Sequence, residues 1–171
     1  RGLMRNPVRR HDSASTVECA RTRSSVRPSG MSMMRPAGRP CFAISRTGAK
    51  IIAVTGSVGK TGTKEMLAAA FGALGQMHAS KASHNNHWGV PLSLAGMHAG
   101  CDYGIFEIGM NHSGEITPLS QMVKPDIAII TTVAPVHMEH FESVRQIADA
   151  KAEVFDGMNH NGAAVLNRDN E

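Results

Sequence analysis

The feature that most constrains the fold is a glycine-rich segment lying between a β-branched apolar run and a helical pattern. Residues Ile51–Thr55 are almost all aliphatic or β-branched, which is typical of a strand buried inside a parallel sheet. Apolar residues at helical spacing then run through Thr63–Leu74. A strand, a glycine-rich turn and a helix in this order predict an α/β fold whose first loop binds phosphate. The loop residues are Gly56, Ser57, Val58, Gly59, Lys60 and Thr61.

This loop has the chemistry of a shortened phosphate-binding motif, GxxGKT. Its glycines allow backbone N–H groups to surround a phosphate, Lys60 can reach the outer phosphates, and the Thr61 hydroxyl suits Mg²⁺. The longer form of the motif has a glycine six residues before its lysine, and Val54 occupies that position here. An ordinary glycine-rich turn is the alternative, and the Lys-Thr pair at the helix start favours phosphate binding.

Strand-like and helical segments continue to alternate after this unit. Tyr103–Ile108, Asp126–Thr132 and Ala163–Leu166 have strand composition, whereas Glu115–Val123 and Ser143–Met158 have helical spacing. This alternation predicts a mostly parallel sheet flanked by helices, as in P-loop nucleotide-binding proteins. The residues expected to face the sheet are Met66, Leu67, Ala70, Phe71 and Leu74 in the first helix and Ile116, Leu119 and Val123 in the second.

The loops after Thr55, Ile108 and Thr132 are the candidate sites, because such sheets bind ligands beyond the carboxyl ends of their strands. Glu107 lies near the end of the second of these strands. A carboxylate within an apolar strand is costly to bury without a partner. Mg²⁺ beside ATP phosphates is a suitable partner, and a lysine or arginine at the sheet edge is the alternative.

Two basic side chains complete the set of candidate residues. His137 lies in the loop after the third strand, which favours a metal or phosphate role. A zinc site with His140 has little support, because no cysteine pair or HExxH helix accompanies these histidines. Lys151 falls in the middle of the apolar stripe of Ser143–Met158. Burying an ammonium is expensive, so the pattern by itself favours a side chain that reaches water over one that performs chemistry.

Charge divides the 171-residue chain into two parts. Residues 1–49 contain ten arginines, no lysine and two acidic residues, a net charge of +8, whereas residues 50–171 contain eight basic and twelve acidic residues, a net charge of −4. The first part has no hydrophobic period and is predicted to be a disordered or non-native leader. A transit peptide and a nucleic-acid-binding arm are alternatives, and the lack of any aromatic residue before Phe42 argues against nucleic acid.

Two further classes of protein are excluded by composition. No apolar run approaches the roughly 20 residues that a membrane span needs. The three cysteines are scattered and form no CxxC pair, which argues against a disulfide framework or a cysteine-built zinc site.

Five motifs in the second part together resemble one known family. Over roughly residues 50–171, the sequence is similar to the central ATP-binding domain of Mur ligases. The motifs are TGSVGKT at 55–61, NNHWGVP at 85–91, EIGMNHSGEI at 107–116, the loop around His137 and AKAEVF at 150–155. The second and third motifs most resemble the Mur ligases that use D-alanyl-D-alanine. Folylpolyglutamate synthases share the first motif but fit the second and third less well.

The resemblance implies a role for each residue of the predicted loops. Lys60 and the amides of residues 56–61 would hold the phosphates of ATP. Thr61 and Glu107 would ligate Mg²⁺, and His137 would ligate a second Mg²⁺. Lys60 and His137 would therefore also count among the catalytic residues.

Three more residues acquire implied roles from the same resemblance. Asn85 and Asn86 would lie near the substrate and the phosphates. Lys151 matches a lysine that many family members carbamylate, and this modification turns an ammonium into an anion able to position Mg²⁺. A catalytic, metal-positioning Lys151 would account for a lysine within an apolar stripe, and it reverses the interpretation drawn from the pattern alone.

The activity implied is ATP-dependent amide formation in peptidoglycan precursor synthesis, in which D-alanyl-D-alanine is added to UDP-N-acetylmuramoyl-tripeptide through an acyl phosphate. We therefore expect ATP and Mg²⁺ as cofactors, a cytoplasmic location and a monomer. Family members have further domains on both sides of this one, so we expect a fragment that is incomplete at its C-terminus and inactive alone. The alternatives are a folylpolyglutamate synthase-like ligase and a non-enzymatic fragment that binds nucleotide or nucleic acid.

Overall fold

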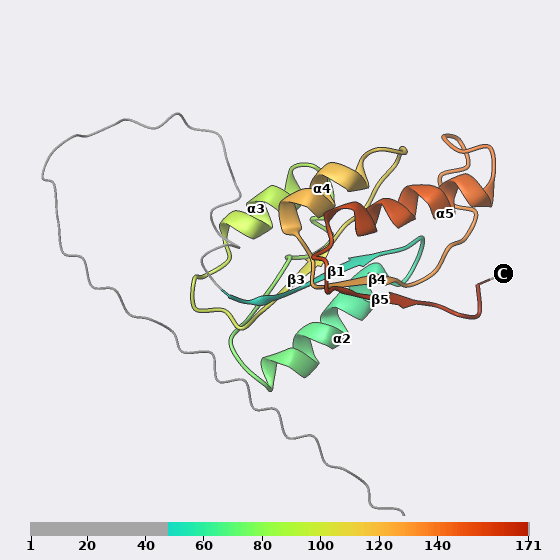
Figure 1. The fold of residues 1–171 in the computed structure, drawn as a ribbon. Helices are drawn as coiled ribbons and strands as arrows, with labels where there is room; N and C mark the ends of the chain where they lie inside the picture. The colour runs from blue at the N-terminus through green and yellow to red at the C-terminus, as the bar shows by residue number, and fades with distance from the viewer. Residues whose placement is uncertain (1–47, 171) are drawn as a thin grey trace, which may run out of the picture. The chain divides into compact units, whose positions relative to one another are not determined.

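The described part of the chain, residues 48–170, contains a five-stranded parallel sheet with helices on both faces. The computed structural model in Figure 1 places α3, α4 and α5 on one face and α2 on the other. Nearly all of the leader predicted over residues 1–49 lies outside the described residues. In chain order the elements are β1 (Lys50–Thr55), α2 (Lys60–Gly72), β2 (Met77–Ala79), α3 (Gly89–Ala95), β3 (Tyr103–Glu107), α4 (Ile116–Val123), β4 (Ile127–Ile130), α5 (Val144–Ala152), the 3₁₀ helix η2 (Glu153–Gly157) and β5 (Ala163–Leu166).

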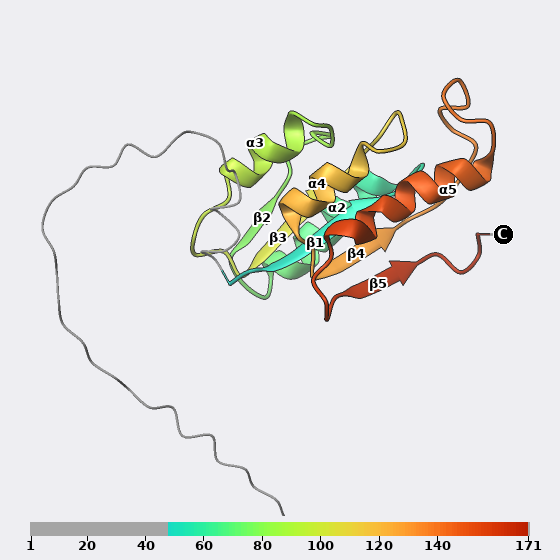
Figure 2. The same cartoon turned by 45° about the horizontal axis from the view of Figure 1, so that its top comes forward.

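The sheet has the order β2-β3-β1-β4-β5, and every neighbouring pair of strands is parallel. This arrangement confirms the predicted fold class. Residues 51–55 of the central strand β1 are all buried, because helices cover the sheet from both sides (Figure 2). A strand in this position needs an almost continuous aliphatic run, which is what the sequence provides. The result is a larger apolar cluster under α3, α4 and α5 and a smaller one under α2.

The register of the three central strands aligns their carboxyl ends. Val54 in β1 lies beside Glu107 in β3, and Thr55 lies beside Ile130 in β4. The three loops expected to carry ligands therefore leave the sheet at the same edge, as a parallel topology requires.

The helix after the glycine-rich loop begins earlier than predicted, and its buried face is different. α2 begins at Lys60, and its buried residues are Lys64 and Ala68. The predicted stripe is wrong at Met66, Ala70 and Leu74, which are all exposed, Met66 by 67% and Leu74 by 71%. The loop fixes how the helix is rotated about its axis, so Met66 and Ala70 point to solvent although their spacing is helical, whereas Leu74 lies beyond the end of α2 at Gly72.

The remaining elements agree with the prediction in part. α4 buries Ile116, Leu119 and Val123 as expected, and β5 has the predicted bounds. The predicted helix over residues 143–158 consists of α5 followed by η2, a tighter 3₁₀ turn. The pattern does not reveal β2 and α3, because three and seven residues are too few to show a clear period.

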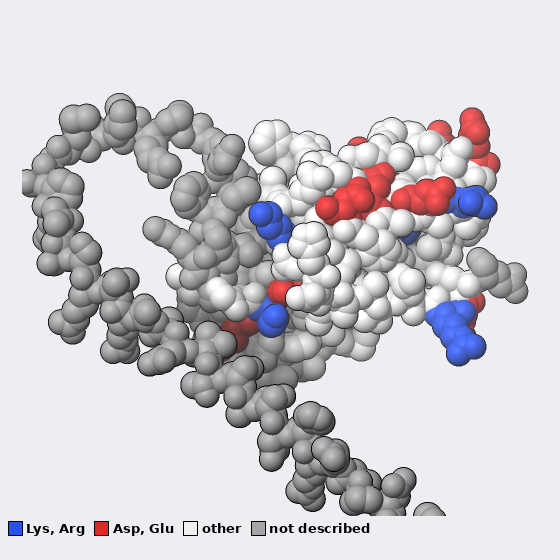
Figure 3. All heavy atoms as spheres, viewed as in Figure 1, with Lys and Arg blue, Asp and Glu red and all other residues white. Residues whose placement is uncertain are grey.

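Acidic side chains are prominent on the face viewed in Figure 3, where they lie over α5, η2 and the loop before α5. The arginine-rich arm of the nucleic-acid alternative lies almost wholly outside the described residues, so this alternative stays a prediction. The acidic residues of α5, η2 and the loop before α5 are Glu139, Glu142, Asp149, Glu153 and Asp156.

Among the helices of the described residues, none combines the length and the apolar character needed to cross a membrane.

Glu153 joins η2 to the start of α4. Its Oε1 accepts hydrogen bonds from Ser113 Oγ and Gly114 N at 3.1 and 2.6 Å. Its Oε2 accepts from Ile116 N and Thr117 N at 3.1 and 3.2 Å. The first N–H groups of a helix have no partner within it, and a carboxylate there also complements the helix dipole. Glu153 therefore caps α4 from a different element of the fold.

Replacing Glu153 with alanine is expected to lower the free energy of unfolding by about 1–3 kcal/mol, because the capped N–H groups lose their acceptor. Urea unfolding of the chain measures the change. Asp149→Ala is the matched control, since Asp149 is exposed on α5 and its loss should cost less than about 0.5 kcal/mol. Equal destabilisation by the two substitutions would contradict the capping role.

Candidate functional site

The glycine-rich loop leaves β1 in a conformation that depends on the absence of a side chain. Gly56 has φ +145°, and a Cβ on it would overlap Thr131 Oγ1, just after β4. Gly59 has φ +83° and forms the N-cap of α2. The two glycines thus let the backbone pass close to the end of β4 and then turn into the helix. This brings the N–H groups at the start of α2 around the loop, where an anion could bind.

Hydrogen bonds connect this loop to the segment that follows β4. Ser57 N donates to Thr132 O at 2.7 Å. Ser57 Oγ donates to Ala134 O at 3.0 Å and accepts from Ala134 N at 2.9 Å. Thr131 Oγ1 donates to Val58 O at 2.6 Å. Contacts outside the loop therefore hold it in one shape, which reduces the ordering cost of binding a ligand.

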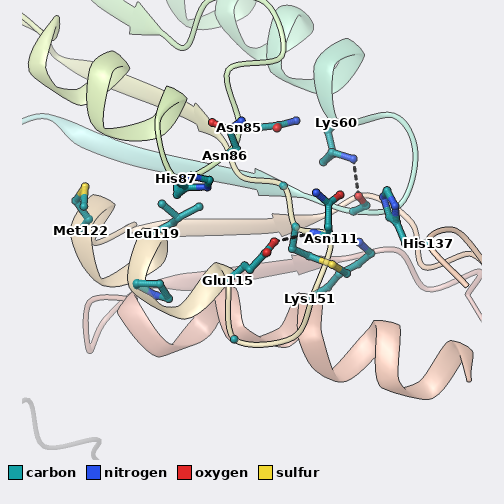
Figure 4. Close-up of a pocket in the computed structure, with 15 residues that line it drawn as sticks. Lys60, Asn85, Asn86, His87, Asn111, Glu115, Leu119, Met122, His137 and Lys151 are labelled. Carbon is teal, nitrogen blue, oxygen red and sulfur yellow. Dashed lines mark hydrogen bonds between the residues drawn. The ribbon is translucent and has the colours of Figure 1, made fainter. Parts of the chain in front are cut away.

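Lys60 places its ammonium at the mouth of the loop. Its Nζ donates to Gly56 O at 2.8 Å and to Ser57 O at 3.3 Å (Figure 4). Burial lowers the pKa of Lys60, and the nearby Glu107 carboxylate opposes this by raising it. The ammonium is held by neutral carbonyl oxygens, and a phosphate would be a stronger partner.

Glu107 is buried at the end of β3 and is satisfied by two donors. The residue is only 1% exposed. Thr61 Oγ1 donates to Glu107 Oε2 at 2.9 Å, and Asn85 Nδ2 donates to Oε1 at 2.8 Å. The partners of Glu107 are therefore a hydroxyl and an amide, and not the lysine or arginine of the alternative prediction. The structure brings together the two residues expected to ligate Mg²⁺.

A cavity of about 390 Å³ opens beside this carboxylate. Its walls are loop residues 57–62 together with Ser83, Asn85 and Glu107. The oxygens of Thr61 and Glu107 suit Mg²⁺, which prefers hard oxygen ligands, and the N–H groups at the helix start suit phosphate oxygens. The residues present therefore fit a magnesium ion bound beside a nucleotide phosphate.

A larger cavity of about 630 Å³ shares Lys60 and Asn85 with the first and contains the other predicted residues. Lys60, His137 and Lys151 line one end of it, each from a different segment, and Asn86 borders it from the loop before α3 (Figure 4). The opposite end includes apolar residues of α4. They are Pro118, Leu119 and Met122.

Lys151 does not reach water, so the interpretation drawn from its pattern alone is wrong. The residue is 2% exposed and lies in α5 on the buried face that also contains Ile147 and Ala150. Burial, the larger cause, and the neighbouring Lys60 ammonium together lower the pKa of Lys151 to about 8. The side chain faces the larger cavity instead of bulk solvent.

His137 sits at the rim of the cavity on an unusual backbone. Its φ is +58°, a left-handed conformation that is uncommon for a residue with a side chain. Its carbonyl accepts a hydrogen bond from His140 N at 2.9 Å, and its Nδ1 lies 3.9 Å from Glu139 Oε1. Backbone strain of this kind concentrates at functional positions, and here it accompanies a side chain that lines the cavity.

The two adjacent asparagines make different contacts. Asn85 donates from its side chain to Glu107, and its carbonyl accepts from Gly109 N at 2.7 Å. Asn86 Oδ1 accepts from Trp88 N at 3.1 Å and Gly89 N at 2.9 Å, at the start of α3. Asn85 therefore belongs to the carboxylate site, whereas Asn86 stabilises the helix start while bordering the cavity.

Glu115 lies in the same cavity wall with its carboxylate turned away from its own helix. It accepts from Asn111 N at 2.7 Å and lies 3.2 Å from His112 Nδ1. The Asn111 hydrogen bond is the main cause that lowers the pKa of Glu115. Glu115 thus orders the loop after β3.

Two residues that contact the site, Ser80 and Thr131, carry no motif signal. Ser80 Oγ accepts from the backbone N of Glu107 at 3.0 Å, and Thr131 packs against the loop. Small polar residues such as these are not distinguished by pattern. Lys64 was also missed, although it is one of the two buried residues of α2.

Residues 54–171 match the family model described as the Mur ligase middle domain. The chain belongs to the Mur ligase family. The resemblance carried by the five motifs is therefore confirmed, and the sheet described above is that of a Mur ligase middle domain.

Two of the similar proteins, from Rickettsia prowazekii and Escherichia coli, have the same name. The UDP-N-acetylmuramoyl-tripeptide–D-alanyl-D-alanine ligase of Rickettsia prowazekii is 45% identical over 122 residues, which is 71% of this chain and 27% of that protein. The Escherichia coli protein of the same name is 39% identical over 122 residues. The chain thus spans about 27% of the length of these relatives.

Solved structures of Mur ligases are also similar to this chain. MurF from Acinetobacter baumannii has a TM-score of 0.74 and 32% identity, and the match covers 77% of this chain and 29% of that chain. MurF ligase from Thermotoga maritima, solved in complex with ADP, has a TM-score of 0.71 and 27% identity and covers 76% of this chain and 30% of that one. The FolC protein of Escherichia coli, at 15% identity and a TM-score of 0.51, is similar in fold alone.

The buried ammonium of Lys151 makes stability depend on pH. Its pKa is about 8 in the folded chain against an ordinary value of 10.5, so between these values the unfolded chain binds more protons and stability rises with pH. Lys151→Met removes the cost of burying the charge. We therefore expect it to raise the free energy of unfolding at pH 7 by up to about 3 kcal/mol, with a smaller gain near pH 10.

Urea unfolding in CO₂-free buffer at the two pH values tests this expectation. Lys124→Met is the matched control, because Lys124 is exposed at the end of α4 and its replacement should leave the pH dependence unchanged. A gain of the same size at both pH values would show that packing, and not charge, is responsible.

Proposed function

We propose that this chain carries the ATP site of a ligase that adds D-alanyl-D-alanine to UDP-N-acetylmuramoyl-tripeptide in the cytoplasm, as a step of peptidoglycan precursor synthesis. The observation that carries the proposal is the convergence of a phosphate loop, the Thr61–Glu107 pair and three basic residues on two adjoining cavities. The names of the similar proteins supply the two substrates. We further propose that the working protein is a monomer.

Each element of the site has a proposed role. The N–H groups of residues 56–61 and the ammonium of Lys60 hold the ATP phosphates. Thr61 and Glu107 hold one Mg²⁺, and His137 helps to hold a second. Bound there, Mg²⁺ would supply positive charge that stabilises the oxygens of the transferring phosphoryl group. Asn85 orients Glu107 through its hydrogen bond, and Asn86 holds the start of α3 at the cavity edge.

The proposed reaction has two steps. A carboxylate oxygen of the peptide substrate attacks the γ-phosphorus of ATP, the bond to the β–γ bridging oxygen breaks, and ADP and an acyl phosphate result. The amine nitrogen of D-alanyl-D-alanine then attacks the acyl carbon, phosphate leaves with the C–O bond electrons, and the amine loses a proton. The protein contributes mainly position and charge, and Lys60 stabilises the negative charge on the phosphoryl oxygens.

We also propose that Lys151 is carbamylated in the working enzyme. The neutral amine would attack CO₂, forming an N–C bond and releasing a proton, and the product is an anion. The burial of Lys151 in a cavity that also contains Lys60 supports this, because an anion there is attracted by the very ammonium that repels a protonated lysine. As a carbamate, Lys151 would position Mg²⁺ beside the phosphates.

Lys60→Ala in the complete gene product should weaken ATP binding and lower kcat/KM by at least about 100-fold, because the loop loses its only side-chain cation. Phosphate release that requires ATP, the UDP-linked tripeptide and D-alanyl-D-alanine together measures the activity. Lys50→Ala is the control, since Lys50 is exposed at the opposite end of β1 and its replacement should leave kcat/KM unchanged. Phosphate release with folate and glutamate in place of these substrates would overturn the substrate assignment.

The carbamate proposal predicts a ¹³C resonance that depends on Lys151 and on pH. At a fixed pressure of ¹³CO₂, the signal should grow as the pH rises from about 6.5 to 8.5, since only the neutral amine reacts and the pKa of Lys151 is about 8. It should be absent in Lys151→Met and present in Lys60→Ala. A wild-type protein with full activity and no carbamate signal would overturn this role.

A further inference from the structure

Lys64 of α2 is a charged residue buried away from both cavities. Its side chain is 0% exposed, and it is absent from the walls of the two cavities. The Nζ donates to Ser80 O at 2.9 Å and to Ala82 O at 2.6 Å, and it lies 2.9 Å from Glu65 Oε1. These three partners match the three N–H bonds of an ammonium group.

Burying an ammonium in this position costs free energy unless its hydrogen-bond partners replace its hydration. An apolar side chain of similar length would fill the same volume without the cost of removing a charge from water. Glu65 is 63% exposed, so its attraction for Lys64 is partly screened by solvent. The two carbonyls are therefore the contacts that distinguish Lys64 from an apolar residue.

Both carbonyls belong to the segment that leads from β2 toward the site, Ser80–Asn85. One end of this segment touches Glu107 through Ser80 Oγ, which accepts from the Glu107 backbone N at 3.0 Å. The other end touches Glu107 through the Asn85 side chain at 2.8 Å. Between them, Ala82 has φ +48°, so the segment makes a turn that an alanine does not favour. Lys64 holds the middle of this turn.

We propose that Lys64 is a positioning residue for the magnesium site, acting through Asn85. Thr61 and Lys64 lie one turn apart on α2, so one helix controls both oxygens of Glu107. Thr61 contacts Oε2 directly, and Lys64 fixes the segment whose Asn85 contacts Oε1. This inference rests on the proposed function, because it assigns Glu107 to a metal ion.

The first test measures the segment itself in the ligand-free protein. Gly109 N donates to Asn85 O, so its hydrogen exchange reports whether the segment is in place. Lys64→Met in the complete gene product should accelerate this exchange about 10-fold or more. Glu65→Gln, which leaves the carbonyl contacts of Lys64 intact, should change it less than about twofold. Wild-type exchange in Lys64→Met would overturn the proposal whatever the protein's activity.

The second test asks whether the effect reaches the metal through Asn85. The Mg²⁺ concentration needed for half-maximal binding of a non-hydrolysable ATP analogue should rise about 10-fold in Lys64→Met, whereas metal-free nucleotide binding should change less than about twofold. In an Asn85→Ala background, Lys64→Met should add no further change, since the route to Glu107 is already lost. Additive effects of the two substitutions would overturn the proposal.

If Lys64→Met does not fold, the same measurements on Lys64→Gln decide the question. That variant keeps an amide donor and removes the charge, so it should show the same changes to a smaller degree, and wild-type behaviour would overturn the proposal. Failure of the wild-type protein to bind the ATP analogue would reject the proposed function instead, while the exchange of Gly109 would still test the anchoring by Lys64.

Discussion

The buried carboxylate of Glu107 is the interaction on which the site depends. A carboxylate that is almost wholly removed from water is stable only if other donors replace its hydration. The donors come from two segments that the chain places far from β3 in sequence, Thr61 in α2 and Asn85 before α3. Parallel pairing brings these segments to one edge of the sheet, and the carboxylate then fixes them relative to one another.

The cavities combine this carboxylate with an excess of positive charge nearby. Lys60 and Lys151 line the same cavity, and the Lys60 ammonium adds to burial, the larger cause, in lowering the pKa of Lys151. Two cations confined in this way need an anion between them. A nucleotide phosphate or a substrate carboxylate would meet that need, and carbamylation of Lys151 would instead replace one of the two cations with an anion.

The parts that sequence reasoning predicted are those with strong local patterns. The buried strand over residues 51–55, the glycine-rich turn into α2 and the position of Glu107 at the end of a strand follow from the requirements of a parallel sheet covered by helices. The depth of Lys151 does not follow, because pattern alone cannot tell a side chain that reaches water from one that faces a cavity. Lys64 was missed for a different reason. The rotation of α2 depends on the backbone of the loop before it, and the apolar stripe of the helix indicates a different buried face from the one that contains Lys64 and Ala68.

The paired hydrogen bonds between Ser57 and Ala134 join the phosphate loop to the segment that leads to His137. If these two segments open to solvent together, as one cooperative unit, their stabilities are linked. Free energy released when a phosphate binds the loop would then also stabilise the histidine segment, although the phosphate need not touch it. The first ligand to arrive would order a wall that a second ligand uses, so the second would bind with a smaller entropic loss.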